Sequence, residues 1–304
     1  MDKPYSRREF LGAVGATATV AVMAASSAAP DAGSAEAGAT AATKPRLFAG
    51  CCAYSFSKYL ADKRMSMEDF ILKAVEMGVQ GVDMTTYWFK STEPAYLAHL
   101  RHFAYKNGMP FSGAAISTNM VLPDPAKRAE ELAKIKQWVD RTELLGASHL
   151  RVFGGEVPAG AREEQAIQWV VEIMKPACEY AASKGVILGI ESHGGITSKA
   201  ANIIEILRRV DSPYAGINLD ISNFPENEYA QIEACVPYAT HAHIRDHFTE
   251  GHGPIDLDRV WQLFAKGAYK GYMSAEYEGE EDAMTGVPKL IEKIKALCRK
   301  YSSV

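Results

Sequence analysis

Residues 186–193 of this 304-residue chain read Val-Ile-Leu-Gly-Ile-Glu-Ser-His, and the rest of the sequence can be understood from them. The run is apolar and of strand length, and it ends abruptly in Glu191 and His193. A run this apolar predicts a strand covered on both faces, as in a parallel sheet. Because side chains alternate along a strand, Gly189, Glu191 and His193 share one face of it. The stretch therefore predicts a buried strand that ends in polar side chains.

The same pattern returns three times downstream. Short apolar runs end at Asp220, at His243 and at Glu276. Intervals of 29, 23 and 33 residues separate the four side chains, and each interval is about the length of one strand–helix–strand unit. Four ligand-type residues in phase with the strands are the main functional signal in the sequence.

Strand and helix patterns alternate along the whole chain after residue 46. We expect strands at 47–56, 79–85, 111–117, 147–153, 186–193, 214–220, 239–243 and 271–275. We expect helices at 67–77, 94–106, 125–145, 163–183, 199–210, 229–235, 257–266 and 288–300. This alternation predicts an α/β protein with a (β/α)8 TIM barrel, in which active-site groups lie where strands end. A doubly wound open sheet is the alternative, but no G-x-G-x-x-G motif follows the first strand.

The amino-terminal residues differ in composition from the rest. Ser6-Arg7-Arg8-Glu9-Phe10-Leu11-Gly12 resembles a twin-arginine export motif, and the mildly apolar stretch 13–25 is too short to span a bilayer. A basic tail is the alternative interpretation. We expect a twin-arginine signal peptide over 1–29, a flexible Ala/Gly/Ser/Thr-rich linker over 30–45 and the barrel over 46–304. The expected location is periplasmic or extracytoplasmic, without membrane contact after signal removal.

Composition excludes several classes of protein. Hydrophobic residues make up 47% of the chain and charged residues 23%, which fits one large α/β domain. The formal net charge is −4 and no basic stripe occurs, so we expect no nucleic-acid partner. Five cysteines without a C-x-x-C pair are no disulfide framework. Oligomerisation with identical chains is left open by the sequence.

The four phased residues have the chemistry of a metal site. Three carboxylates and one imidazole suit one divalent cation such as Mn²⁺, Mg²⁺, Co²⁺ or Zn²⁺. Without a cation, three buried carboxylates would repel one another and their pKa values would rise. The alternative is that each residue caps a helix or forms a salt bridge. We therefore predict these metal ligands: Glu191, Asp220, His243 and Glu276.

Three further polar residues are candidates for substrate binding. His193 shares a strand face with Glu191, and Asn223 follows Asp220 by three residues. Arg245 shares a strand face with His243, where it either binds a substrate oxygen or pairs with a ligand carboxylate.

These motifs carry a family resemblance over roughly residues 47–300. The sequence resembles the xylose isomerase-like barrel family, also described as sugar phosphate isomerases and epimerases. The matching segments are Ile190-Glu191-Ser192-His193-Gly194-Gly195, Asn218-Leu219-Asp220 with Asn223-Phe224, His243-Ile244-Arg245-Asp246, Gly251-His252-Gly253-Pro254-Ile255-Asp256 and Ala275-Glu276-Tyr277-Glu278.

The resemblance implies roles for the two glutamates. In ketose 3-epimerases of this family, the residues that match Glu191 and Glu276 bind the metal and act as a catalytic acid/base pair, while Asp220 and His243 match the remaining ligands. Arg245 stands where lysine is commoner, and Asn223 replaces a histidine found in some epimerases. Both departures weaken any transfer of a particular substrate.

The expected function is a metal-dependent isomerase or epimerase acting on a small carbohydrate. The predicted export disfavours phosphorylated sugars and favours a free sugar or keto-sugar. The same proton abstraction next to a carbonyl would also serve a lyase or hydratase on 3-keto-glycosides. A phosphodiesterase similar to endonuclease IV and a non-catalytic sugar-binding barrel are further alternatives.

Overall fold

Eight parallel strands close into a barrel in the computed structural model, which describes residues 45–302. The strands are β1 Arg46–Cys52, β2 Gly81–Thr85, β3 Phe111–Ala115, β4 His149–Val152, β5 Ile187–Glu191, β6 Ala215–Asp220, β7 Ala239–Ile244 and β8 Lys270–Ala275. Each strand pairs with the next in sequence, and β8 pairs with β1 from Arg46↔Lys270 to Cys51↔Ala275. The predicted (β/α)8 TIM barrel is confirmed, and the open-sheet alternative is wrong.

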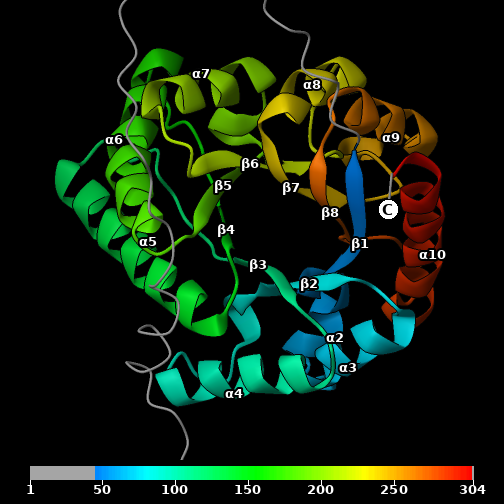
Figure 1. Cartoon of the computed structure of the whole chain (residues 1–304). Helices are drawn as coiled ribbons and strands as arrows, with labels where there is room; N and C mark the ends of the chain where they lie inside the picture. The colour runs from blue at the N-terminus through cyan, green and yellow to red at the C-terminus, as the bar shows by residue number, and fades with distance from the viewer. Residues whose placement is uncertain (1–44, 303–304) are drawn as a thin grey trace, which may run out of the picture. The chain divides into compact units, whose positions relative to one another are not determined.

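Helices surround the ring of strands (Figure 1). They are α2 Ser57–Ala61, α3 Met67–Met77, α4 Pro94–Lys106, α5 Pro125–Leu145, α6 Glu163–Ala182, α7 Ala200–Val210, α8 Glu228–Cys235, α9 Leu257–Lys266 and α10 Ala283–Tyr301. Local sequence explains their ends. Ser66 and Asp69 form a capping box at the start of α3, and Gly78 ends that helix with a φ of 66°. At α5 the side chain of Asp124 accepts a hydrogen bond from the Ala126 amide, and Gly146 ends the helix with a φ of 86°.

Two of the expected boundaries are wrong by four residues or more. The first strand ends at Cys52 instead of residue 56, because the chain turns into a 3₁₀ segment, Ala53–Phe56, and then the short helix α2. The last helix begins at Ala283 instead of residue 288, because the side chain of Asp282 accepts a hydrogen bond from the Met284 amide. Pro288 therefore lies within this helix rather than at its start, and a proline is a weak marker of where a helix begins.

The barrel interior is polar below its mouth. Three polar side chains of the strands are buried there: Ser112, His149 and His241. A Cβ atom at Gly189 would overlap the ring of His149, so glycine is required there for steric reasons. The apolar core instead lies between the outside of the barrel and the helices, where residues such as Trp261 are fully buried.

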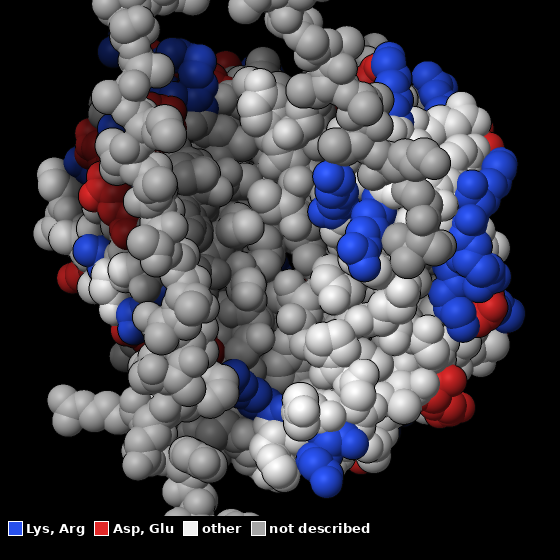
Figure 2. Space-filling view, viewed as in Figure 1, with Lys and Arg blue, Asp and Glu red and all other residues white. Residues whose placement is uncertain are grey.

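Basic side chains gather on the side of the barrel where α10 lies (Figure 2). Four lysines of this helix pair with carboxylates: Lys289 with Glu281, Lys293 with Asp246, Lys295 with Glu292 and Lys300 with Asp258. Much of the positive charge on this surface is therefore balanced locally. All five cysteines are buried as free thiols.

The predicted signal peptide, residues 1–29, lies outside the described residues, as does the linker 30–45 except Pro45. Within the described part of the chain, no helix combines the length and the apolar character needed to cross a membrane.

Candidate metal centre

The four predicted ligands come together at the carboxyl ends of β5 to β8. Glu191 and Asp220 are the last residues of β5 and β6, His243 is the penultimate residue of β7, and Glu276 directly follows β8. All four are buried, with at most 3% of their surface exposed. One ligand atom of each lies within 4.8 Å of the ligand atoms of the others. Consecutive parallel strands thus place residues far apart in sequence around one point.

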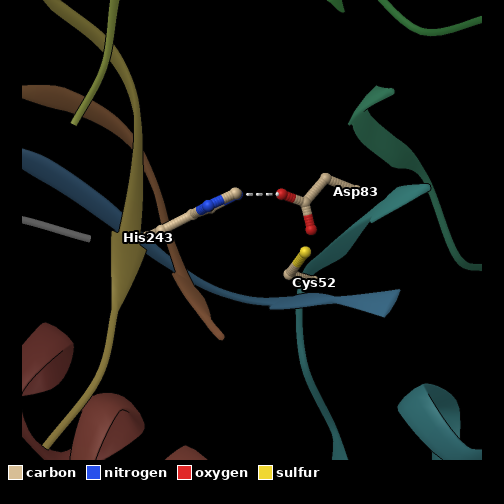
Figure 3. A group of neighbouring side chains, drawn as sticks. All are labelled: Cys52, Asp83 and His243. Carbon is tan, nitrogen blue, oxygen red and sulfur yellow. Dashed lines mark hydrogen bonds and ion pairs between the residues drawn. The ribbon is translucent and has the colours of Figure 1, made fainter. Parts of the chain in front are cut away.

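The ring of His243 lies between two ligand carboxylates on one side and the carboxylate of Asp83 on the other. Its Nδ1 atom lies 3.3 Å from Glu276 Oε1 and 3.6 Å from Glu191 Oε2. Its Nε2 atom lies 2.7 Å from Oδ2 of Asp83, which belongs to β2 (Figure 3). Asn218 donates a hydrogen bond to Glu191 and lies 3.3 Å from His243 Nδ1. The imidazole is therefore held on both sides.

Asp220 is held by three neighbours. Its Oδ1 atom accepts hydrogen bonds from the amide and hydroxyl of Ser222, at 2.9 and 2.7 Å. Its Oδ2 atom accepts one from Asn223 Nδ2 at 2.7 Å and lies 3.0 Å from Arg245 Nη2. Asn223 also donates to the carbonyl oxygen of Ser192. Two predicted substrate-binding residues, Asn223 and Arg245, thus contact a predicted metal ligand.

Arg245 is the main positive charge on one side of the centre. Besides Asp220 it contacts Glu276 at 2.8 Å and Glu278 at 2.7 Å. Arg245 therefore pairs with ligand carboxylates, which is one of the two roles expected for it. His193, the third predicted substrate-binding residue, has its ring 4.4 Å from that of Phe153, and burial lowers its pKa while the charges of Asp220 and Glu276 act against that lowering.

Arg151 is the corresponding positive charge on the other side. It is 3% exposed, its Nε lies 3.1 Å from Glu191 Oε2, and its guanidinium lies over the ring of Phe153. Its position near the end of β4, on the strand that pairs with that of Glu191, is the signal in the sequence that could have marked it as part of the site.

The environment separates the pKa values of the two glutamates. Burial, together with the charges of Glu276 and Asp220, raises the pKa of Glu191 to about 7, although Arg151 and His243 oppose the shift. Burial acts in the same direction on Glu276, but His243 and Arg245 hold its pKa well below the usual range. Two carboxyl groups whose pKa values are driven apart are typical of an acid/base pair.

Asp83 and Cys52 are the neighbours of the centre that sequence reasoning missed. Asp83 is a buried carboxylate in β2, and His243 holds its pKa below the usual value despite burial. Cys52, the last residue of β1, lies 3.7 Å from Glu276, and burial raises the pKa of its thiol to about 12. An aspartate within an apolar strand was a usable signal, but it lies two residues before the strand end and was not counted with the other four.

The residues present fit a divalent cation. Four donors from separate strands converge, and the carboxylates outnumber the two arginines that face them. Several buried polar atoms around the centre have no hydrogen-bond partner: Asp83 Oδ1, Asn218 Oδ1, Arg151 Nη1 and Arg245 Nε. Buried polar atoms are rarely left unpaired, so this set indicates a site built for an additional charged group.

Cavities beside the centre provide room for a small molecule. One of about 580 Å³ lies between the loops that follow β7 and β8, and its lining includes Arg245, His247, Phe248, Tyr277 and Glu278. A smaller one of about 250 Å³ lies beside the ends of β4 and β5, and its lining includes Asn119, Phe153, Glu156 and His193. Mixed aromatic and polar walls suit a polyhydroxylated ligand.

Several solved structures are similar to this chain. A D-allulose 3-epimerase from Methylomonas sp. has a TM-score of 0.69 at 20% identity, covering 84% of this chain and 100% of its own. A 3-keto-D-glucoside 4-epimerase from E. coli has a TM-score of 0.65 at 14% identity, and the match covers 84% of this chain and 100% of the epimerase chain. A probable 3-DHS dehydratase from Bacillus anthracis has a TM-score of 0.63 at 17% identity, and the match covers 82% of this chain and 98% of the dehydratase chain. At such identities, likeness establishes the fold alone.

No curated protein matches the sequence. The model of one protein family, described as xylose isomerase-like TIM barrel, does match it, over residues 71–298. This segment is most of the chain and includes all four residues of the candidate centre. By its sequence and by its closed barrel, the chain belongs to the xylose isomerase-like TIM barrel family.

Proposed function

We propose that this protein is a divalent-metal-dependent sugar isomerase or epimerase that removes a proton next to a carbonyl group. The observation that carries the proposal is the convergence of four buried ligands: Glu191, Asp220, His243 and Glu276. Three carboxylates and one imidazole suit Mn²⁺, Mg²⁺, Co²⁺ or Zn²⁺. Family membership and the similar epimerase structures support a carbohydrate as the substrate.

Glu191 and Glu276 are the proposed acid/base pair. A cation in this centre would polarise the substrate carbonyl as a Lewis acid, which makes the neighbouring C–H bond more acidic. The two glutamates come from β5 and β8, with two strands between them, which supports their acting from different sides of one carbon.

The substrate is proposed to enter through the cavities at the ends of the strands. His193, beside Phe153, lines the smaller cavity, and Arg245 lines the larger one. Both remain proposed substrate-binding residues, Arg245 in addition to its contacts with Asp220 and Glu276. Asn223 is proposed to act on the substrate through Asp220, which it orients.

Proton exchange with solvent tests the proposal directly. The metal-loaded protein would be incubated in D₂O with free sugars and 3-keto-glycosides, followed by NMR and mass spectrometry. An epimerase or isomerase is expected to incorporate deuterium at the carbon next to the carbonyl and to form an isomeric product. Binding without any exchange would contradict the proposal and leave a sugar-binding barrel.

A lyase or hydratase acting on 3-keto-glycosides is the second candidate. It shares the first step, because loss of the same proton allows a substituent on the next carbon to leave. The similarity to a probable dehydratase favours keeping this candidate. In the D₂O experiment it would release the aglycone and form an unsaturated product instead of an isomer.

We also propose that the protein is exported by the twin-arginine route, on the basis of Arg7, Arg8 and the apolar stretch that follows them. An exported enzyme would meet free sugars more often than phosphorylated ones. Replacing both arginines with lysine should retain the protein in the cytoplasm, and cell fractionation would detect the change. Unchanged export would contradict this proposal.

A further inference from the structure

Asp83 is a buried carboxylate that the proposed reaction does not use. It lies on β2, while its partner His243 lies on β7, so β1 and β8 separate their strands around the barrel. The contact therefore crosses the interior instead of following a neighbouring strand (Figure 3). Asp83 is 3% exposed and His243 is fully buried. A buried charge in this position is costly unless it is paired, so the contact is a specific feature of the site.

The geometry distinguishes the two nitrogens of His243. Nε2 lies 2.7 Å from Asp83 Oδ2, a short hydrogen bond in which the ring donates its proton to the carboxylate. Nδ1 faces the other way, toward Glu276 and Glu191. An imidazole whose Nε2 carries the proton presents the lone pair of Nδ1. That lone pair lies on the side of the ring that faces Glu276 and Glu191, two of the three ligand carboxylates.

We propose that Asp83 is a positioning residue that fixes the orientation and tautomer of His243, so that Nδ1 is the metal-binding atom. This inference rests on the metal site of the proposed function. Histidines that bind metals commonly donate their second N–H to a carboxylate, and removal of such a partner weakens metal binding by about 10- to 100-fold.

One alternative uses the same residues differently. Ligand atoms of Cys52, Asp83 and His243 lie within 4.8 Å of one another, so these three side chains could hold a second ion, with His243 shared between the two. Asp83 would then be a ligand and not a positioning residue. The hydrogen bond to Nε2 favours the positioning role, because that bond occupies the nitrogen that a second ion would need.

Co²⁺ is the probe for the test, because its absorption spectrum reports metal affinity and its paramagnetism makes the N–H proton of a metal-bound histidine visible by NMR. Its affinity and stoichiometry would be measured by absorption titration of the wild type, Asp83→Asn and Asp83→Ala. The Co²⁺-loaded proteins would also be studied by proton NMR in water, where a metal-bound histidine gives a shifted, solvent-exchangeable N–H signal. The candidate quartet contains one histidine, so that signal is assignable to Nε2–H of His243.

Ser112→Ala is the matched control, because Ser112 contacts the neighbouring inward histidine, His241, at 3.3 Å. We expect the wild type to bind about one Co²⁺ per chain and to show the N–H signal. Asp83→Asn, which keeps an acceptor but removes the charge, should bind about 10-fold more weakly, and Asp83→Ala up to about 100-fold more weakly. Their N–H signals should broaden through faster exchange, while Ser112→Ala should match the wild type. Should the alanine variant not fold, the asparagine variant decides.

Equal Co²⁺ affinity and an unchanged N–H signal in Asp83→Asn would overturn the inference while leaving the proposed function standing. Two ions per wild-type chain, falling to one in Cys52→Ala, would overturn it in favour of a second metal site. No Co²⁺ binding by the wild type would overturn both the inference and the metal dependence of the proposed function.

Discussion

His243 and His241 lie two residues apart on the same inward face of β7, and both are almost completely buried. Their electrostatic environments are opposite. Burial disfavours the charged form of His243, but Glu276, Cys52 and Asp83 raise its pKa well above the usual value. Burial dominates at His241 and lowers its pKa to about 4. The comparison separates the mouth layer around His243 from the lower layer around His241.

The lower layer is a set of neutral polar side chains. The ring of His241 stacks on those of His149, at 5.1 Å, and Tyr272, at 6.2 Å, and its Nε2 lies 3.3 Å from Ser112. The difference teaches that an inward histidine in a barrel is no functional signal by itself. What distinguishes the mouth layer is the number of carboxylates that converge on one ring nitrogen.

The largest expected effect comes from making the same substitution in both layers. His243→Ala should abolish tight binding of a divalent cation, because it removes the nitrogen ligand; we expect a loss of more than about 100-fold, beyond that of an outer partner. His241→Ala should leave cation affinity within about threefold and lower stability by about 1–3 kcal/mol through unpaired polar neighbours. Titration calorimetry and thermal unfolding measure the two effects. Equal losses of affinity would mean that the two layers form one site.

The second prediction tests the glutamates of the mouth layer. Glu191→Gln and Glu276→Gln keep an oxygen ligand but remove the base, so each should lower kcat by about 10²- to 10⁴-fold. For an epimerase the double variant should be little worse than either single variant, because both break the same proton path. A lyase would depend strongly on one glutamate and weakly on the other.

Metal content must be measured in these variants, because loss of the ion would mimic a catalytic defect. Glu292→Gln, which changes an exposed carboxylate on α10, is the matched control and should keep normal turnover. Near-normal turnover in both metal-loaded mouth variants would show that the acid/base assignment is wrong.

The smallest expected effect is a loss of protein stability at acidic pH that arises in the lower layer. The folded-state pKa of His241, about 4, lies below its ordinary value of 6.5, so the unfolded chain binds a proton first as the pH falls. Stability is therefore lost as the pH drops from 6.5 toward 4, by about 1.5 kcal/mol between pH 6.5 and 5 from this one group. His241→Phe should remove that part of the pH dependence, as measured by urea unfolding. His102→Phe, at an exposed histidine, should leave the slope unchanged.

Much of the candidate site was predictable because it repeats with the strands. Glu191, Asp220, His243 and Glu276 each end an apolar run, and a closed barrel brings the carboxyl ends of its strands together. Asp83 obeyed the same rule less clearly, since it precedes the end of its strand by two residues. Its importance comes from a contact across the barrel, which no interval in the sequence encodes.

The roles of the polar residues near the quartet required the tertiary structure. The sequence placed Asn223 and Arg245 beside the ligands, but whether they face a substrate or a carboxylate depends on where the loops after β6, β7 and β8 lie. His193 was expected to share a strand face with Glu191, but β5 ends at Glu191 and the ring of His193 packs on Phe153.

The sequence by itself determined the order of strands and helices, the closed eightfold alternation and the four side chains at the strand ends. These features depend on local propensity and periodicity, which short stretches of chain carry. Only the tertiary structure decided which histidine lies among carboxylates, which nitrogen of His243 faces Glu276 and Glu191, and which carboxylate binds its other nitrogen. Those properties depend on distances between residues more than a hundred positions apart, as between Asp83 and His243, and electrostatic energy depends on distance in space and on burial.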